Sequence, residues 1–276
     1  MNILFLIFLI VIIYYLFRIY LYLIDNSFKE SFDKPRVAIC LRGAISKGHS
    51  FFNQGDLYSA EPYLDYKKCY RTIMKYIVEP NQVRYDIDFI CHGWNVDLQD
   101  DLVDMYKPKK FLFENNNDYK DYISSLCEEP GDFSCVSQGL SIKKVIELKE
   151  EYEKEIGKDY DLVLLYRYDI VLWKPIVFDN YDTDKIYVNA HEDSNGDFHF
   201  VMNKENASEF KYLIDSIDKG NKCITHYWIK NYVNNYMKKE LISDDILPAV
   251  HQEVIRKIDA FSIEPGRLSQ EDFDKM

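Results

Sequence analysis

The chain is short of the residues that mark several classes of protein. Ten glycines and eight prolines, beside an apolar fraction of 47%, exclude a collagen-like or disordered chain. Six cysteines without a C-x-x-C pair exclude a disulfide scaffold and a zinc ribbon. Basic residues are outnumbered as well: 34 Lys and Arg against 46 Asp and Glu give a formal charge of −12. This balance argues against a general nucleic-acid-binding protein, because neutralising phosphates needs a surplus of positive charge.

A long apolar run is present at the N-terminus. Residues 3–24 are interrupted only by Arg18, and as a helix they would span roughly 30 Å, the thickness of the hydrocarbon core of a bilayer. A cleavable signal peptide needs a basic start and a small-residue cleavage site, yet the first 37 residues contain no Ala or Gly. We therefore predict a single-pass membrane protein with an anchor over residues 1–24, a polar stalk over residues 25–34 and one domain over residues 35–276.

Short apolar runs alternate with helical patterns after residue 35. Runs typical of strands cover Arg36–Leu41, Tyr85–His92, Lys110–Phe113, Asp161–Leu165, Lys185–Val188 and Phe198–Met202, and helical spacing covers Tyr66–Val78, Leu98–Tyr106, Ser137–Ile156, Ala207–Ser216, Ile224–Met237 and Asp245–Lys257. This alternation predicts an α/β fold with a single, mainly parallel sheet flanked by helices. Such sheets bind ligands at the carboxyl ends of their strands, so the residues that follow each strand are the candidate site residues.

A glycine-containing loop follows the first predicted strand. Gly43 and Gly48 are separated by four residues and precede His49, which is one substitution away from the phosphate loop G-x-x-x-x-G-K-[ST]. That loop needs a lysine where this chain has His49. We therefore favour a nucleotide-facing loop in which Arg42 contacts a diphosphate and Gly43 allows close backbone approach. A P-loop-like kinase or sulfotransferase is the alternative.

The second predicted strand ends in His92, Gly93 and Trp94. An aromatic ring at a strand end can stack on a base or a sugar, although packing in the core is the more common role for a residue such as Trp94. For His92 the ordinary expectation is a hydrogen-bonded, partly buried position. Both residues are candidates for ligand binding.

The most informative segment is Tyr166–Asp169, which lies between two apolar runs. Burying a charge costs several kcal/mol unless the charge is paired or bound to a metal. In one interpretation Arg167 and Asp169 form an ion pair with each other. In the other, Asp169 binds Mg²⁺ or Mn²⁺ together with a diphosphate ligand, since these ions prefer oxygen ligands.

Several segments together resemble a known family. They are Val37–Gly43, Tyr85–Trp94, Tyr106–Lys109, Ser137–Gln138, Tyr160–Asp169 and Gly196–Met202. Their order is similar to that in a family of glycosyltransferases with a GT-A-like, Rossmann-like fold, found in giant viruses, bacteria and eukaryotic microbes. The resemblance covers roughly residues 36–270. In that family an R-x-D element, here Arg167–Asp169, stands in the place of the D-x-D motif of other GT-A enzymes.

The resemblance implies transfer of a sugar from a nucleotide-sugar donor to a hydroxyl of a glycan, lipid or protein. It implies donor binding by six residues, namely Arg42, Gly43, His92, Trp94, Arg167 and Asp169. It also implies a divalent cation, Mn²⁺ or Mg²⁺, at Asp169. Because the first Asp of D-x-D is replaced by Arg167, a non-catalytic sugar-binding module is a further alternative.

A catalytic base is the last element that the reaction class suggests. An inverting glycosyltransferase needs a carboxylate that deprotonates the acceptor hydroxyl. Asp193 and Asp197 in the polar segment His191–Asp197 are the candidates, and Asp197 is preferred because it directly precedes a predicted strand. The alternative for this segment is a solvated turn, since it is rich in Asp, Ser, Asn and Gly.

Overall fold

The computed structural model describes residues 12–20, 34–46, 63–129, 132–191, 194–223, 227–244 and 252–254. The chain divides into two compact units, Met1–Pro35 and Arg36–Met276. In the first unit, residues 12–20 form a helix with exposed apolar side chains. Every helix within the described ranges is too short or too polar to cross a lipid bilayer. The predicted anchor and stalk extend over positions outside these ranges and stay predictions.

The second unit is built on a seven-stranded sheet. Its strands are β1 (Arg36–Gly43), β2 (Asp86–Gly93), β3 (Lys110–Phe113), β4 (Leu162–Arg167), β6 (Ile186–His191), β7 (Ser194–Asn203) and β8 (Leu241–Asp244). They run in the order β3-β2-β1-β4-β7-β6-β8. The pairs β3–β2, β2–β1, β1–β4 and β6–β8 are parallel, whereas β7 is antiparallel to both β4 and β6. The predicted mainly parallel α/β sheet is confirmed.

A two-stranded sheet corrects one predicted helix. Helical spacing was expected over Asp245–Lys257, but Gln252–Val254 form strand β9, which pairs antiparallel with β5 (Ile170–Leu172). The other positions of that predicted helix lie outside the described residues. The prediction is wrong at Gln252–Val254 because residue spacing over so short a segment does not distinguish a helix from a strand. Backbone pairing with the buried β5 segment decides between the two conformations.

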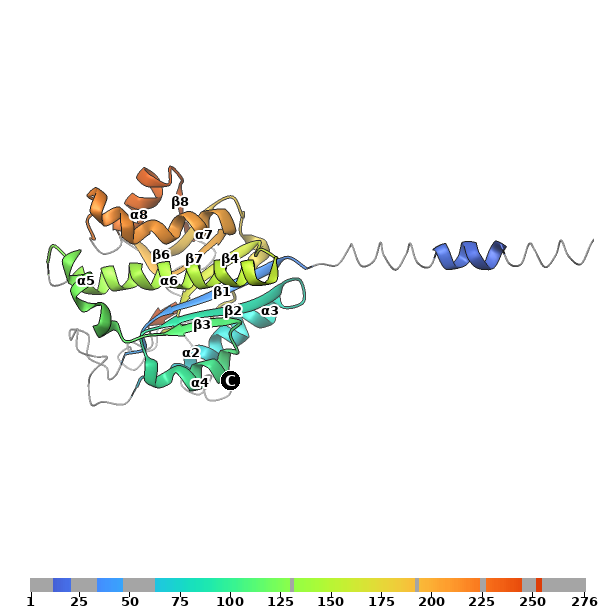
Figure 1. Ribbon diagram of the computed structural model, residues 1–276, viewed down its shortest axis with the longest axis horizontal. Helices are drawn as coiled ribbons and strands as arrows, with labels where there is room; N and C mark the ends of the chain where they lie inside the picture. Colours follow the sequence, from blue (N-terminus) through green and yellow to red (C-terminus); the bar gives the residue numbers. More distant parts are fainter. Residues whose placement is uncertain are drawn as a thin grey trace, which may run out of the picture. The chain divides into compact units, whose positions relative to one another are not determined.

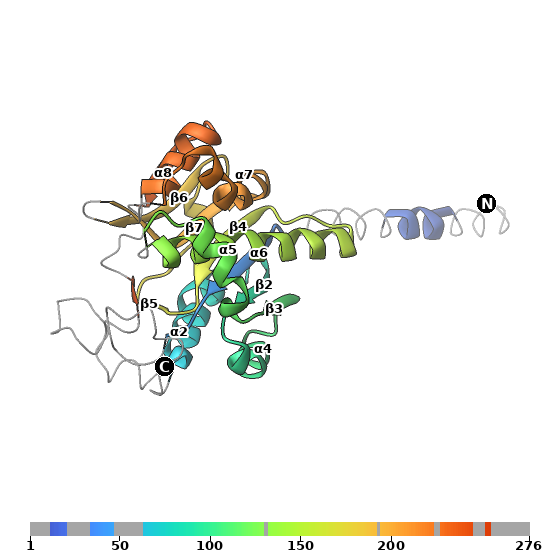
Figure 2. The same cartoon turned by 60° about the vertical axis from the view of Figure 1, so that its left-hand side comes forward.

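Helices cover both faces of the main sheet (Figures 1 and 2). They are α2 (Tyr66–Ile73) with its continuation α3 (Glu79–Asn81), α4 (Gln99–Tyr106), α5 (Lys120–Ser125), α6 (Phe133–Ile156), α7 (Lys204–Phe210) and α8 (Tyr227–Asn231). One apolar core joins the sheet to α6, α7 and α8, and a second joins the opposite face to α2 and α4.

Alternation along β1 assigns its side chains to these two cores. Ala38 and Cys40 are buried with the α6 core, whereas Val37, Ile39 and Leu41 are buried with the α2 core. Successive side chains of a strand point to opposite faces of the sheet. The next side chain in the Ala38–Cys40 series is Arg42, which therefore lies on the α6 face at the carboxyl end of β1.

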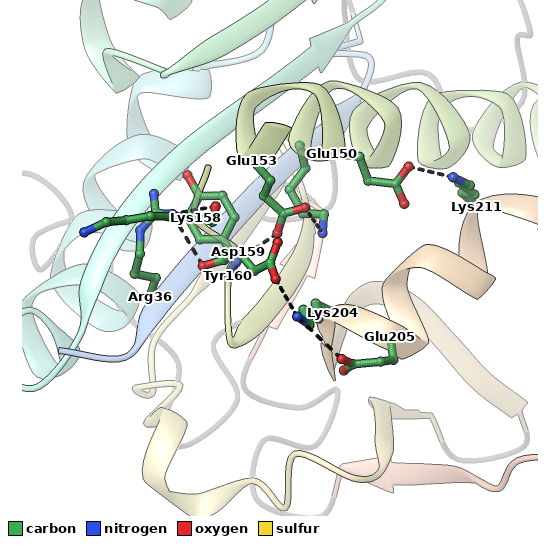
Figure 3. Close-up of polar contacts among 10 residues, drawn as sticks. Arg36, Glu150, Glu153, Lys158, Asp159, Tyr160, Lys204, Glu205 and Lys211 are labelled. Atoms are coloured by element: carbon green, nitrogen blue, oxygen red, sulfur yellow. Dashed lines mark hydrogen bonds and ion pairs between the residues drawn. The ribbon is translucent and has the colours of Figure 1, made fainter. Parts of the chain in front are cut away.

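A disulfide near its start and a hydrogen bond near its end connect helix α6 to other segments. Near its start, a disulfide joins Cys135 to Cys223 in the segment before α8. It ends at Gly157, whose positive φ of 65° suits glycine. Just before that end, Glu153 accepts a hydrogen bond from the Tyr160 N–H at 2.8 Å, one of the contacts in Figure 3. The first turns of α6 thus lie near the carboxyl ends of β1 and β4, and its last turn near their amino ends.

Candidate functional site

Charged side chains meet where the connections of the sheet diverge. From β1 the chain forms β2 and then β3 on one side of β1. It then returns and forms β4 on the other side of β1. In a doubly wound sheet such a switch point is where a ligand crevice forms, at the carboxyl ends of the strands. Here Arg42 is in register with His92 of β2 and with Arg167 of β4. We take this edge of the sheet as the candidate functional site.

Arg42 is a buried cation with little compensation. Its side chain is 1% exposed, and its terminal Nη2 donates to the main-chain oxygen of Asp197 at 2.7 Å. Its Nε has no hydrogen-bond partner, and no carboxylate among the described residues lies within ion-pair distance of it. Burial lowers the pKa of Arg42 to about 10, and Arg167 adds to this shift, although the charges of Asp197 and Asp169 oppose it.

The positive charge of Arg167 is neutralised by two carboxylates. Its Nε and Nη2 donate to the two carboxylate oxygens of Asp169, each at 2.9 Å, and its Nη1 donates to Oδ2 of Asp197 at 3.0 Å. Burial by itself would lower the pKa of Arg167, but the charges of Asp169 and Asp197 outweigh it and raise the pKa. The ion-pair interpretation of Arg167 and Asp169 is the one that the structure shows.

Asp197 joins the two arginines to helix α6. Its Oδ2 accepts a second hydrogen bond from Nε2 of Gln138 at 2.9 Å, and its side chain is only 13% exposed. Asp197 reaches this position because β7 runs antiparallel beside β4. Of the two predicted bases, Asp197 therefore lies in the site, whereas Asp193 lies outside the described residues. This contact of Gln138 was not predicted, although Ser137–Gln138 is one of the segments that resemble the glycosyltransferase family.

A hydrogen-bonded series supports the loop that follows β1. The Gly43 N–H donates to Oγ of Ser141 on α6 at 2.9 Å, and that hydroxyl lies 2.7 Å from Nδ1 of His92. Nε2 of His92 lies 3.3 Å from the carboxylate of Glu114. The ionised carboxylate of Glu114 can only accept, so Nε2 of His92 donates to it. Burial lowers the pKa of His92 and favours the neutral ring, whose Nδ1 then accepts from the Ser141 hydroxyl. Ser141 and His92 are both fully buried, so this series positions Gly43 and does not offer a nucleophile.

We expect Ser141→Ala to lower the free energy of unfolding by about 1–3 kcal/mol, because it leaves the partly buried Gly43 N–H and Nδ1 of the buried His92 without their partner. Urea unfolding measures the change. Ser125→Ala is the matched control, since Ser125 is exposed and bonds only within its own helix, and we expect it to change stability by no more than about 0.5 kcal/mol. Equal small effects of both variants would show that Ser141 does not support the loop.

Trp94 and Glu114 complete this series. The Trp94 ring is 6% exposed and packs against His92 and Tyr119, with ring centroids 4.6 and 5.6 Å apart. Glu114 is also held by Lys144 at 2.8 Å and by the Tyr119 hydroxyl. The structure thus gives Trp94 and His92 packing and positioning roles, the ordinary ones for these residues. Their predicted contact with a donor stays a prediction.

Glu114 makes the stability of the protein depend on pH. The hydrogen bond from His92 is the largest cause that lowers the pKa of Glu114, from 4.5 to about 2, with Lys144 and Tyr119 adding to it against the effect of burial. A carboxyl group with a lowered pKa stabilises the folded state above its unfolded pKa and loses that contribution as the pH falls through its folded pKa. We therefore expect the stability difference between the wild type and Glu114→Gln to be constant above about pH 5 and to shrink between about pH 4.5 and pH 2. Urea unfolding at a series of pH values checks this, and a difference that is the same at every pH would contradict it.

The loop residues Lys47–Ser50 lie outside the described residues, and with them the His49 on which the P-loop alternative depends. Gly43 itself has a φ of 98°, a conformation that glycine adopts without strain, and a Cβ at this position would meet nothing within 4 Å. The space beside the Gly43 Cα is therefore open, and the predicted approach of a donor to this backbone stays a prediction.

The carboxylates of the site do not fit the predicted divalent cation. Mg²⁺ and Mn²⁺ need several oxygen ligands with free lone pairs in near-octahedral geometry. Both oxygens of Asp169 and Oδ2 of Asp197 are already engaged by Arg167. Among the described residues, no group of three or more His, Cys, Asp or Glu side chains is placed to hold a metal ion.

Comparisons with known proteins give a distant structural likeness. No protein-family model matches the chain, and no curated protein sequence is similar to it. One similar solved structure is described as a glycosyltransferase involved in the glycosylation of the major capsid of PBCV-1. The identity is 9%, the match covers 76% of this chain and 82% of that chain, and the TM-score is 0.36. A likeness this distant does not transfer a function, because one fold serves many chemistries.

Proposed function

We propose that the protein is a glycosyltransferase that uses a nucleotide-sugar donor and transfers the sugar to a hydroxyl of a glycan, lipid or protein. The observation that carries the proposal is the buried guanidinium of Arg42 at the carboxyl edge of a doubly wound sheet, which has no direct carboxylate partner among the described residues and keeps one N–H group without a hydrogen bond. The ordered resemblance of the sequence motifs to GT-A-like glycosyltransferases supports it.

The charge of Arg42 calls for an anionic ligand. A buried cation costs several kcal/mol unless an anion compensates it. Within the described residues Arg42 bonds directly only to a main-chain oxygen, and the charges of Asp197 and Asp169 offset its burial only in part. A guanidinium presents its N–H groups as a planar fork that can bind two oxygens of a phosphate in a bidentate manner. The diphosphate of a nucleotide sugar would supply that anion, beside the open backbone of Gly43. Arg167 would take part through its second edge, since each of its terminal nitrogens carries two N–H groups.

The same edge offers a base for the acceptor. In an inverting transfer, Asp197 would deprotonate the attacking hydroxyl while the arginines stabilise the departing diphosphate. The carboxylate of Asp197 lies next to Arg167, so the base and the leaving-group charge would be a few ångströms apart. The proposal keeps the N-terminal anchor, which would hold the enzyme at a membrane that carries the acceptor.

A thermal-shift screen tests the proposed function. Full-length protein in detergent is heated with UDP, GDP and CMP sugars, each compared with the free sugar and with ATP. A ligand that binds only the folded protein at about 100 times its Kd stabilises it by about 2.7 kcal/mol and raises the Tm by several degrees. We expect one class of nucleotide sugar to do so. A shift with ATP alone would favour the kinase alternative, and no shift with any nucleotide sugar would contradict the proposal.

A further inference from the structure

The arrangement around Arg167 bears on how the proposed site neutralises its ligand. At phosphate-binding sites a divalent cation is held by one or two carboxylates together with phosphate oxygens and water, and here the group between Asp169 and Asp197 is a guanidinium. The Arg167 fork spans both oxygens of Asp169 at 2.9 Å and reaches Asp197 at 3.0 Å. The cation between these carboxylates is therefore part of the chain itself.

A metal ion would have to displace these bonds. Asp169 is 3% exposed and offers both of its oxygens to Arg167, and Oδ2 of Asp197 is shared between Arg167 and Gln138. If a cation took those oxygens, the buried guanidinium would lose its partners while a second positive charge entered beside it. Two buried cations at close range repel each other, and neither would be compensated.

The chain keeps donors for an anion after these bonds are made. Arg167 uses three of its five N–H groups on the two carboxylates, and Arg42 uses one on the oxygen of Asp197. The two arginines lie side by side, because Arg42 and Arg167 are in register on adjacent parallel strands. Their remaining N–H groups can contact neighbouring phosphate oxygens of one ligand.

We propose that Arg167 stands in the place of a divalent cation, so that the site binds the diphosphate of its donor through Arg42 and Arg167 without a metal. The inference rests on the proposed function, since it concerns the same site and the same ligand. It replaces the metal role predicted for Asp169 with that of an anchor for Arg167.

Calorimetric titration with UDP as the probe tests the inference on full-length protein in detergent. We expect the Kd measured in EDTA to agree within about threefold with the Kd measured in excess Mn²⁺. Binding that is about tenfold or more tighter in Mn²⁺ would overturn the inference. Electron paramagnetic resonance of Mn²⁺ with the protein alone is the second measurement. We expect the signal of free Mn²⁺ to be undiminished, and loss of one equivalent would also overturn the inference.

The variant Arg167→Ala is expected to make UDP binding depend on Mn²⁺. It leaves Asp169 and Asp197 facing each other without a cation, so we expect Mn²⁺ to tighten UDP binding to this variant by about tenfold or more. A variant indifferent to Mn²⁺ would contradict the assignment of Arg167 to the place of the cation. If no nucleotide binds the wild type under any condition, the proposed function fails, whereas the Mn²⁺ signal still decides whether these carboxylates hold a metal.

Discussion

Asp169→Asn is expected to lower the free energy of unfolding by about 3–5 kcal/mol, because it leaves the buried Arg167 guanidinium without its main partner. Both oxygens of Asp169 bond to Arg167, and the Asp169 side chain is 4% exposed, so water cannot replace the lost charge. At about 2–4 °C per kcal/mol for a domain of this size, the Tm falls by roughly 6–20 °C. Urea unfolding and calorimetry measure the two quantities.

Asp159→Asn is the matched control for this prediction. Asp159 also pairs with a cation, Lys204, but its side chain is 63% exposed, and surface ion pairs contribute about 0–1 kcal/mol. Replacing both partners at once, as in Arg167→Met with Asp169→Leu, should cost less than Asp169→Asn, since no buried charge is left unpaired. Losses of similar size for Asp169→Asn and Asp159→Asn would contradict the buried-pair interpretation.

Arg42→Met is expected to weaken binding of the nucleotide sugar by about ten- to a hundredfold without a comparable loss of stability. The variant removes the charge proposed to contact the ligand, and it also removes a buried cation that no described carboxylate contacts directly. We expect its free energy of unfolding to stay within about 1 kcal/mol of the wild type, since only one hydrogen bond to Asp197 is lost. Arg42→Lys should recover only part of the affinity, because an ammonium cannot reproduce the planar fork. Isothermal titration with the nucleotide sugar found in the screen measures the affinity.

The opposite end of the same strand provides the control. Arg36 begins β1 and donates to Asp88 at 2.9 Å, far from the carboxyl edge of the sheet. We expect Arg36→Met to lower stability while the ligand affinity of the folded protein stays unchanged. A normal affinity of Arg42→Met, together with a large loss in His49→Ala, would contradict the glycosyltransferase proposal and favour the P-loop alternative.

Local patterns in the sequence predicted most of the sheet and four charged residues of the site, namely Arg42, Arg167, Asp169 and Asp197. Lys110–Phe113 forms the predicted strand without a shift at either end, and the apolar run before Arg167 forms β4. Arg167 and Asp169 were identified because charges between buried runs need a partner, and Arg42 and Asp197 because they lie at the ends of predicted strands. Both signals are local: hydrophobic periodicity and the cost of burying a charge act within a few residues of the chain.

The tertiary structure alone decided what those charges meet. Asp197 reaches Arg167 because β7 runs antiparallel beside β4, and Gln138 and Ser141 reach the same edge because α6 begins there. The helix expected at Gln252–Val254 became a strand for the same kind of reason, since β5 offered it a backbone partner. Such contacts join segments that are distant in the chain, and their free energy comes from pairing and burial between elements. Residue spacing within one segment carries no information about which distant segment will supply that pairing, and for this reason the order of the strands had to come from the folded chain.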